Sequence, residues 1–179
     1  MTGGPDDPDL SAANMNADAS ASAASASAWP EWESFVERHG YLSWLDLEVE
    51  FLGDGRAVLA IERDEAFENP IGNDGYNPVH GGIVASLIDT ASAFALRTTF
   101  QNPGQAFLTT TDLNVSYLRP ATGDLRAEAE VLRAGGSTGV TDVTVEGADG
   151  EAAVGRTTYR LFRDGTGDES ETDGGDGKS

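Results

Sequence analysis

The stretch from residue 77 to residue 100 constrains the fold of this chain more than any other. It opens with an Asn-Pro turn dipeptide, passes a His-Gly-Gly and then becomes strongly apolar. Its apolar side chains recur at the spacing of one helix face, at Val84, Leu87, Ile88, Ala91, Phe94 and Ala95. The pattern predicts a long buried helix. Between Gly81 and Phe100 it carries one carboxylate, Asp89, in a chain of 31 acidic residues, so we expect chemistry there.

The length of 179 residues allows one ordinary domain. Residues 1–28 are a low-complexity Ser, Ala and Asp segment, and residues 164–179 are rich in Gly, Asp and Glu, so we expect two disordered tails around a folded domain at 29–163. The first segment lacks the basic start and apolar core of a secretory signal, and no apolar run is long enough for a membrane span. We expect a cytoplasmic protein.

The charge balance excludes several classes of function. With 11 basic and 31 acidic residues the net charge is −20, and Lys178 is the only lysine. No basic run exists for nucleic acid or for an anionic membrane surface. Without cysteine there is no disulfide, zinc-thiolate site or cysteine nucleophile, and we expect no metal and no cofactor. The dispersed acid excess indicates a salt-adapted organism.

The remaining elements predict an α+β fold. A short helix should run from Pro30 to His39 and stop at Gly40. A β-hairpin follows, and after the long helix come four strands that we expect as a meander in an antiparallel sheet of about six. The predicted strands are 45–51, 57–61, 105–118, 123–134, 138–146 and 151–162. The long helix is apolar on nearly all sides, so a second copy of the chain is expected to cover what the sheet does not.

The start of the long helix could bind a polarised carbonyl. Gly81 and Gly82 present backbone N–H groups at the positive end of the helix dipole, and glycine lets a ligand approach closely. Asp89 is a candidate general base or nucleophile, and together these groups suggest ester or thioester hydrolysis. Eight residues separate Gly81 from Asp89, about 12 Å along a helix. An antiparallel pair of helices in a dimer would bring the Gly81 end of one chain to Asp89 of the other.

Two motifs resemble the hotdog-fold acyl-CoA thioesterases of the PaaI-like type. They are His80-Gly81-Gly82 followed by Leu-Ile-Asp-Thr-Ala at 87–91, and the Asp-x-Asn strand with its Pro-Ala turn at 110–121. The resemblance covers roughly residues 45–162. It implies a sheet wrapped around a long central helix, an acyl-CoA substrate, and homodimers that often pair into homotetramers.

The resemblance also implies roles for individual residues. Asp89 matches the family's base or nucleophile, and Gly81 matches the N–H that holds the thioester oxygen, with His80 beside it. Thr110 falls where the family has a Ser or Thr, from the partner strand, that orients water. Gly82 and the nearby asparagines Asn73 and Asn77 are expected to bind substrate. The family's usual upstream asparagine is replaced by Asp74, and which of Asn69, Asn73 and Asn77 reaches the site stays open.

Other interpretations stay open at this point. His80 also fits a helix cap, and Thr110 fits an ordinary strand residue that alternation places on the same face as Asp112 and Asn114. An enoyl-CoA hydratase or dehydratase would use the same scaffold with a histidine and an acid, and a non-catalytic acyl-CoA-binding module would need no carboxylate at 89. The arginines available for CoA phosphates are not ranked by the sequence: Arg97, Arg119, Arg126, Arg133 and Arg156.

Overall fold

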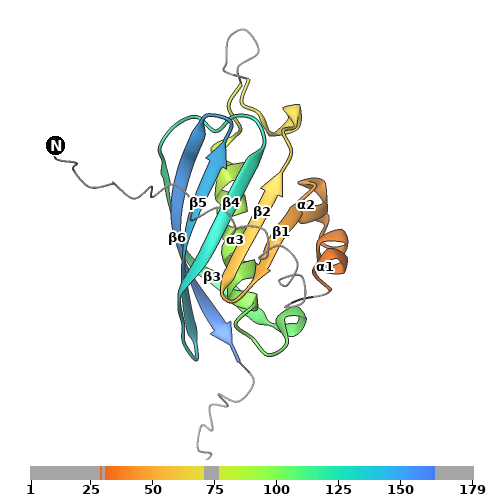
Figure 1. The fold of residues 1–179 in the computed structure, drawn as a ribbon, viewed down its shortest axis with the longest axis vertical. Coiled ribbons are helices and arrows are strands. Elements are labelled where there is room, and N and C mark those ends of the chain that lie inside the picture. The colour runs from red at the N-terminus through yellow and green to blue at the C-terminus, as the bar shows by residue number, and fades with distance from the viewer. Residues whose placement is uncertain (1–28, 30, 71–76, 164–179) are drawn as a thin grey trace, which may run out of the picture.

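The computed structural model describes residue 29 and residues 31–70 and 77–163, so the expected tails at 1–28 and 164–179 and Asn73 lie outside the described residues. One long helix, α3 (Gly81–Arg97), lies against a six-stranded antiparallel sheet (Figure 1). The strands are β1 (Glu48–Gly53), β2 (Arg56–Ile61), β3 (Phe107–Tyr117), β4 (Leu125–Ala134), β5 (Thr138–Gly147) and β6 (Gly150–Phe162). The α+β architecture predicted from the sequence is confirmed.

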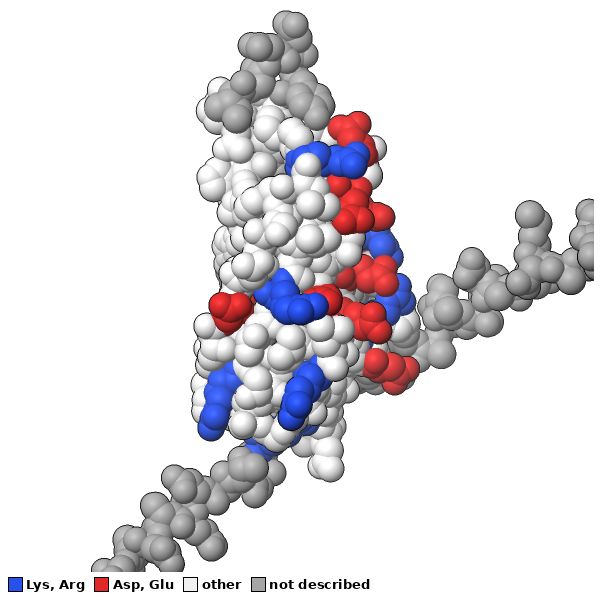
Figure 2. All heavy atoms as spheres, turned by 90° about the vertical axis from the view of Figure 1, so that its left-hand side faces the viewer, with Lys and Arg blue, Asp and Glu red and all other residues white. Residues whose placement is uncertain are grey.

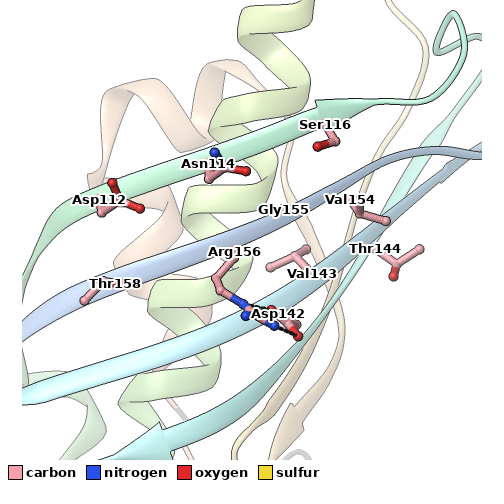
Figure 3. A pocket seen from close by; sticks show the side chains of 10 residues that line it. All are labelled: Asp112, Asn114, Ser116, Asp142, Val143, Thr144, Val154, Gly155, Arg156 and Thr158. Atoms are coloured by element: carbon pink, nitrogen blue, oxygen red, sulfur yellow. Dashed lines mark hydrogen bonds and ion pairs between the residues drawn. The ribbon is translucent and has the colours of Figure 1, made fainter.

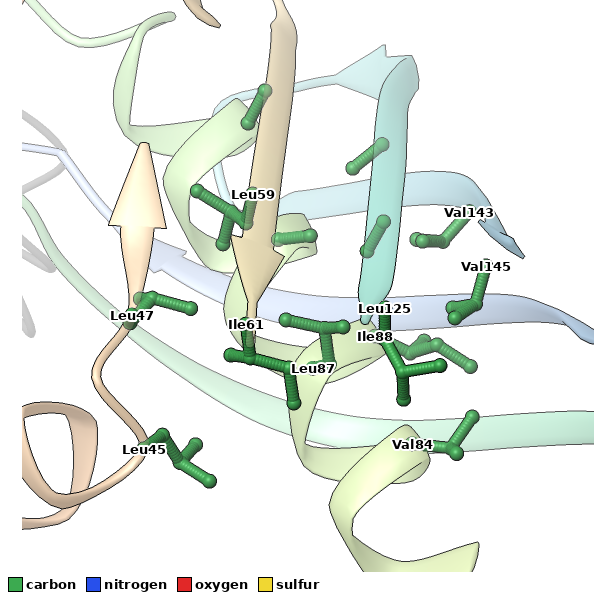
Figure 4. Packing of buried hydrophobic residues seen from close by; sticks show 14 of the residues in the cluster. Leu45, Leu47, Leu59, Ile61, Val84, Leu87, Ile88, Leu125, Val143 and Val145 are labelled. Atoms are coloured by element: carbon green, nitrogen blue, oxygen red, sulfur yellow. The ribbon is translucent and has the colours of Figure 1, made fainter. Parts of the chain in front are cut away.

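The apolar face of α3 holds it against the sheet. Leu87 and Ile88 are fully buried and belong to one cluster with apolar side chains of β2, β4 and β5 (Figure 4). Burial of each such side chain stabilises the fold by about 1.5–3 kcal/mol. A Cβ on Gly155 of β6 would lie 2.6 Å from Ile88 Cγ2, so glycine allows the helix to approach this strand closely. The predicted buried stripe is therefore correct.

The order of the strands departs from the predicted four-strand meander. The sheet order is β1-β2-β4-β5-β6-β3, so β3 pairs only with β6 and forms an edge of the sheet. Strands β6 and β5 lie between β3 and β4 in the sheet, so the connection from β3 to β4 passes over both of them. Only β4, β5 and β6 form a meander, because turn residues mark where a strand ends and say nothing of its pairing partner.

The N-terminal segment forms two helices where the sequence predicted one. Gly40 was expected to end the first helix, but it begins α2 (Gly40–Trp44) directly after α1 (Trp32–Arg38). His39 lies between them, and its Nδ1 accepts a hydrogen bond from the N–H of Leu42, at 3.5 Å, at the start of α2. Two short 3-10 helices, η1 (Glu65–Phe67) and η2 (Pro103–Gln105), lie in the long loops before and after α3.

Helices α1 and α2 pack beside α3 and cover part of its apolar surface. The Phe35 ring lies edge-on to Phe94, with 5.9 Å between the ring centroids, and the Tyr41 hydroxyl donates to Ser86 Oγ at 2.8 Å. A second copy of the chain was the expected cover for everything that the sheet leaves open. The chain itself supplies part of that cover.

Candidate active site

The N-terminus of α3 leaves one backbone donor unused. His80 is the N-cap, and its Nδ1 accepts from the Gly82 N–H at 2.9 Å. The N–H of Ile83 donates to the His80 carbonyl at 2.9 Å. Within the described part of the chain, the Gly81 N–H has no hydrogen-bond partner. Of the two glycines proposed for the helix mouth, Gly81 therefore offers a donor to a ligand, and the donor of Gly82 is already bound.

A hollow of about 300 Å³ lies at this helix end; Asn69, Val79, Gly81, Tyr117 and Arg119 are among the residues that line it, and we call it the Gly81 hollow. Asn69 thus reaches the helix mouth, whereas Asn77 makes a side-chain hydrogen bond with Glu68. Glu68 also bonds to Arg63, which is the main reason that its pKa lies below the ordinary value. Asn73 lies outside the described residues.

Two hydroxyl groups hold the Asp89 carboxylate. Thr110 Oγ1 donates to Asp89 Oδ1 at 2.8 Å, and the Tyr159 hydroxyl lies 2.5 Å from the same oxygen. Tyr159 is only 2% exposed, and burial, followed by the charge of Asp89, raises its pKa well above the usual range. Tyr159 was not predicted as a site residue, because its partner lies 70 residues away and no local pattern links them.

A β-bulge in β3 places Thr110 on the helix side of the sheet. Pairing with β6 shifts between Thr110 and Asp112, so Thr111 is the extra residue. The predicted alternation put Thr110 on one face with Asp112 and Asn114, and this was wrong. Asp112 and Asn114 instead line a polar hollow of about 490 Å³ on the far face of the sheet, together with the ion pair of Arg156 and Asp142 (Figure 3).

Asp89 opens into a cavity of about 330 Å³ between α3, the N-terminal helices and β3, which we call the Asp89 cavity. Both polar and apolar side chains line it. Among them are Phe35, His39, Tyr41, Phe94, Arg97, Leu108 and Tyr159. The rings of Phe35 and Phe94 pack on Trp29 with centroid distances of 5.1 Å each, so these two cavity-lining rings belong to an aromatic cluster. Burial lowers the pKa of Arg97, whose Nη1 donates to the carbonyls of Pro103 and Ala106.

Similarity to known proteins identifies the family of this chain. The family model described as "Thioesterase superfamily" matches residues 76–154. A Halobacterium salinarum protein whose name marks it as an unproven esterase is 46% identical over 139 residues, covering 74% of this chain and 91% of that protein. This chain belongs to the thioesterase superfamily. The acid excess predicted a salt-adapted organism, and the Halobacterium relative supports that prediction.

Two further matches extend the family assignment. Human acyl-coenzyme A thioesterase 13 is 31% identical over 112 residues, which are 60% of this chain and 74% of that protein. The solved PaaI protein of E. coli, from the phenylacetic acid degradation operon, has a TM-score of 0.64 with 24% identity, covering 75% of this chain and 93% of that one. The hotdog fold and the PaaI-like resemblance inferred from the motifs are thereby confirmed.

The structure gives partners or surroundings for four of the five candidate arginines, and the fifth, Arg133, lies near the end of β4. Arg126 pairs with Glu50 and Glu128, and Arg156 with Asp142, both on the strands of the sheet. Arg97 lines the Asp89 cavity, and Arg119 lines the Gly81 hollow, where its Nη1 donates to the Asp149 carbonyl at 2.7 Å. On the face shown in Figure 2, acidic side chains gather along one margin and uncharged residues cover most of the rest.

In one chain, the two groups proposed from the sequence, Gly81 and Asp89, lie apart. Gly81 and Asp89 line different hollows and are separated by eight residues of unbroken helix, about 12 Å. Thr110 contacts the Asp89 of its own chain. Among residues 29, 31–70 and 77–163, no three His, Asp or Glu side chains gather as a metal site. None of the helices in these ranges has the length and apolar character needed to cross a membrane.

Proposed function

We propose that this chain hydrolyses acyl-CoA or aryl-CoA thioesters to the free acid and CoA. One observation carries the proposal: α3 presents a Gly81 N–H that no described residue occupies, and a hydroxyl-bound carboxylate at Asp89. Human acyl-coenzyme A thioesterase 13, a relative, is named for this activity. The cavity beside Asp89 offers aromatic and aliphatic walls for the acyl group.

The reaction uses these groups in a defined order. Asp89 removes a proton from water as the water oxygen adds to the thioester carbon. The carbonyl oxygen becomes an oxyanion and accepts a hydrogen bond from the Gly81 N–H. When the tetrahedral intermediate collapses, the C–S bond breaks and the thiolate of CoA takes up the proton held by Asp89, which restores the carboxylate. Direct attack by the Asp89 carboxylate, followed by hydrolysis of the resulting anhydride, would use the same two groups.

A homodimer would bring the two groups together, and β3 supports one geometry for it. This edge strand is mostly exposed along its length, so its outer backbone groups can pair with another strand. Thr110 near one end touches Asp89, and Tyr117 at the other end touches Gly81. Antiparallel pairing of two β3 strands about a twofold axis therefore aligns Gly81 of one chain with Asp89 of the other. Pairing of such dimers into tetramers stays a prediction from the family resemblance.

CoA carries phosphates into a protein whose net charge is −20, so a local cation is needed. Arg119 is the arginine that lines the Gly81 hollow, and its Nη1 is fixed by a backbone carbonyl. We assign Arg119 to the CoA phosphates. With the thioester carbonyl bound at Gly81, the rest of the CoA molecule would lie along this hollow, which Arg119 also lines.

The test is a panel of acyl-CoA and aryl-CoA esters assayed in concentrated salt by release of free thiol. Asp89→Asn should keep the fold and lower hydrolysis by at least about a hundredfold. If Asp89→Asn turned over every ester at the wild-type rate, Asp89 would lose its role. Crotonyl-CoA is included because hydration without thiol release would identify a hydratase. Bound CoA ester without any turnover would identify a binding module.

A further inference from the structure

The two oxygens of the Asp89 carboxylate have different surroundings. Oδ1 lies 2.5 Å from the Tyr159 hydroxyl and 2.8 Å from Thr110 Oγ1. The Tyr159 hydroxyl also lies 2.7 Å from the backbone carbonyl of Asp89, so its single proton is directed at two oxygens of one residue. For Oδ2 we find no hydrogen-bond partner in the described ranges. One oxygen is held, and the other is available.

Tyr159 is placed rigidly for this contact. It lies in β6 directly opposite Thr110 of β3, and opposite residues share a face, so both hydroxyls lie on the helix side of the sheet. Its ring is buried and packs in a cluster with Leu96 and Leu161. Burial and the adjacent carboxylate both favour the protonated phenol, which keeps the group a donor.

We infer that Tyr159 is a positioning residue that fixes Oδ1 of Asp89 and leaves Oδ2 to take the proton from water. This inference rests on the proposed thioester hydrolysis. With its two donors on one oxygen, the carboxylate is held in one orientation for the attack of water.

The other titratable groups that line the Asp89 cavity are His39 and Tyr41 from the N-terminal helices and Arg97 from α3. The Tyr41 hydroxyl donates to Ser86, and the hydrogen bonds described for Arg97 go to backbone carbonyls. His39 accepts from the Leu42 N–H through its Nδ1. In the described structure none of these three bonds to the carboxylate, so the donors on Asp89 come from Tyr159 and Thr110.

The experiment compares kcat and KM of the wild type with those of Tyr159→Phe and of protein that carries 3-fluorotyrosine at position 159. Tyr159→Phe should lower kcat about tenfold and leave KM nearly unchanged, because the carboxylate loses one of the two donors that orient it. 3-Fluorotyrosine keeps the ring and the hydroxyl donor, so it should keep kcat near the wild-type value.

A purely structural role for Tyr159 would lower the melting temperature and leave kcat of the folded protein unchanged, and that result would overturn the inference. Wild-type protein that hydrolyses no thioester would instead refute the proposed function. In that case crystal structures of the wild type and of Tyr159→Phe still decide the inference. An Asp89 carboxylate with the same orientation in both proteins would contradict it.

Discussion

The Tyr117 hydroxyl donates to the Gly81 carbonyl oxygen at 2.8 Å, so a strand residue is tied to the first turn of α3. A Cβ at position 81 would lie 3.2 Å from Tyr117 Cζ. We predict that Gly81→Ala keeps the fold, because the exposed Tyr117 can shift, but lowers kcat/KM at least about tenfold by misplacing the thioester carbonyl. Gly136→Ala is the control, since a Cβ there meets no atom within 4 Å. Equal activity of the two variants would contradict the role of Gly81.

A shared site predicts complementation between inactive chains. A mixed dimer of Gly81→Ala and Asp89→Asn has one site with both substitutions and one site with neither. Mixed dimers purified through two different tags should therefore recover about half of the wild-type rate. If they showed no more activity than the parental variants, the site would lie within one chain.

Substitution of Arg119 should raise KM only for substrates that carry the CoA nucleotide. We predict that Arg119→Gln raises KM for an acyl-CoA about tenfold, with kcat unchanged, because a hydrogen bond to a charged group is lost. KM for the matching acyl-pantetheine, which lacks the nucleotide, should not change. Arg156→Gln removes the same charge on the far face of the sheet, where Arg156 pairs with Asp142, and serves as the control. The effect should weaken as salt increases.

Three hydroxyls form a buried cluster between α3 and the sheet. Thr141 Oγ1 donates to Ser92 Oγ at 2.8 Å and lies 2.6 Å from Thr157 Oγ1, and all three residues are fully buried. Thr141→Val leaves a buried hydroxyl without its partner and should lower the free energy of unfolding by about 1–3 kcal/mol. Thr144→Val, on the other face of β5, should change it little. Denaturant titration of both variants in salt gives the comparison.

The raised pKa of Tyr159 predicts a loss of stability in alkali. An unfolded chain releases the tyrosine proton near pH 10, whereas the folded protein retains it. Above about pH 10 the unfolded state binds fewer protons, so the free energy of unfolding falls as pH rises. Tyr159→Phe should show a decline shallower by up to about 1.4 kcal/mol per pH unit. Parallel curves for the two proteins between about pH 9 and pH 11 would show that Tyr159 ionises freely.

Helix periodicity and turn residues are local signals, and they predicted α3, its buried face and most strand positions. They failed at one helix end and at the pairing of distant strands. The glycine at position 40 was interpreted as a helix stop, although the side chain of His39 makes it a helix start. The edge position of β3 depends on its pairing with β6, about 45 residues along the chain.

Some residues of the candidate site could likewise be predicted from local signals, and others could not. His80, Gly81 and Asp89 share one helix and could be found together by their spacing. Tyr159 meets Asp89 only through the register of β3 on β6, and no nearby residue signals that contact. The hydroxyl of Thr110 reaches Asp89 because of a bulge that strict alternation does not anticipate.

The extra residue at Thr111 has a consequence for comparing relatives. Upstream of it the even-numbered residues of β3 face the helix, as Leu108 and Thr110 do, and downstream the odd-numbered residues do so, beginning with Leu113. A homologue without the bulge would need a one-residue gap here for its alignment to remain true in space. An ungapped alignment would match inward-facing side chains of one protein with outward-facing side chains of the other. The residue equivalent to Thr110 would then be assigned to the wrong column.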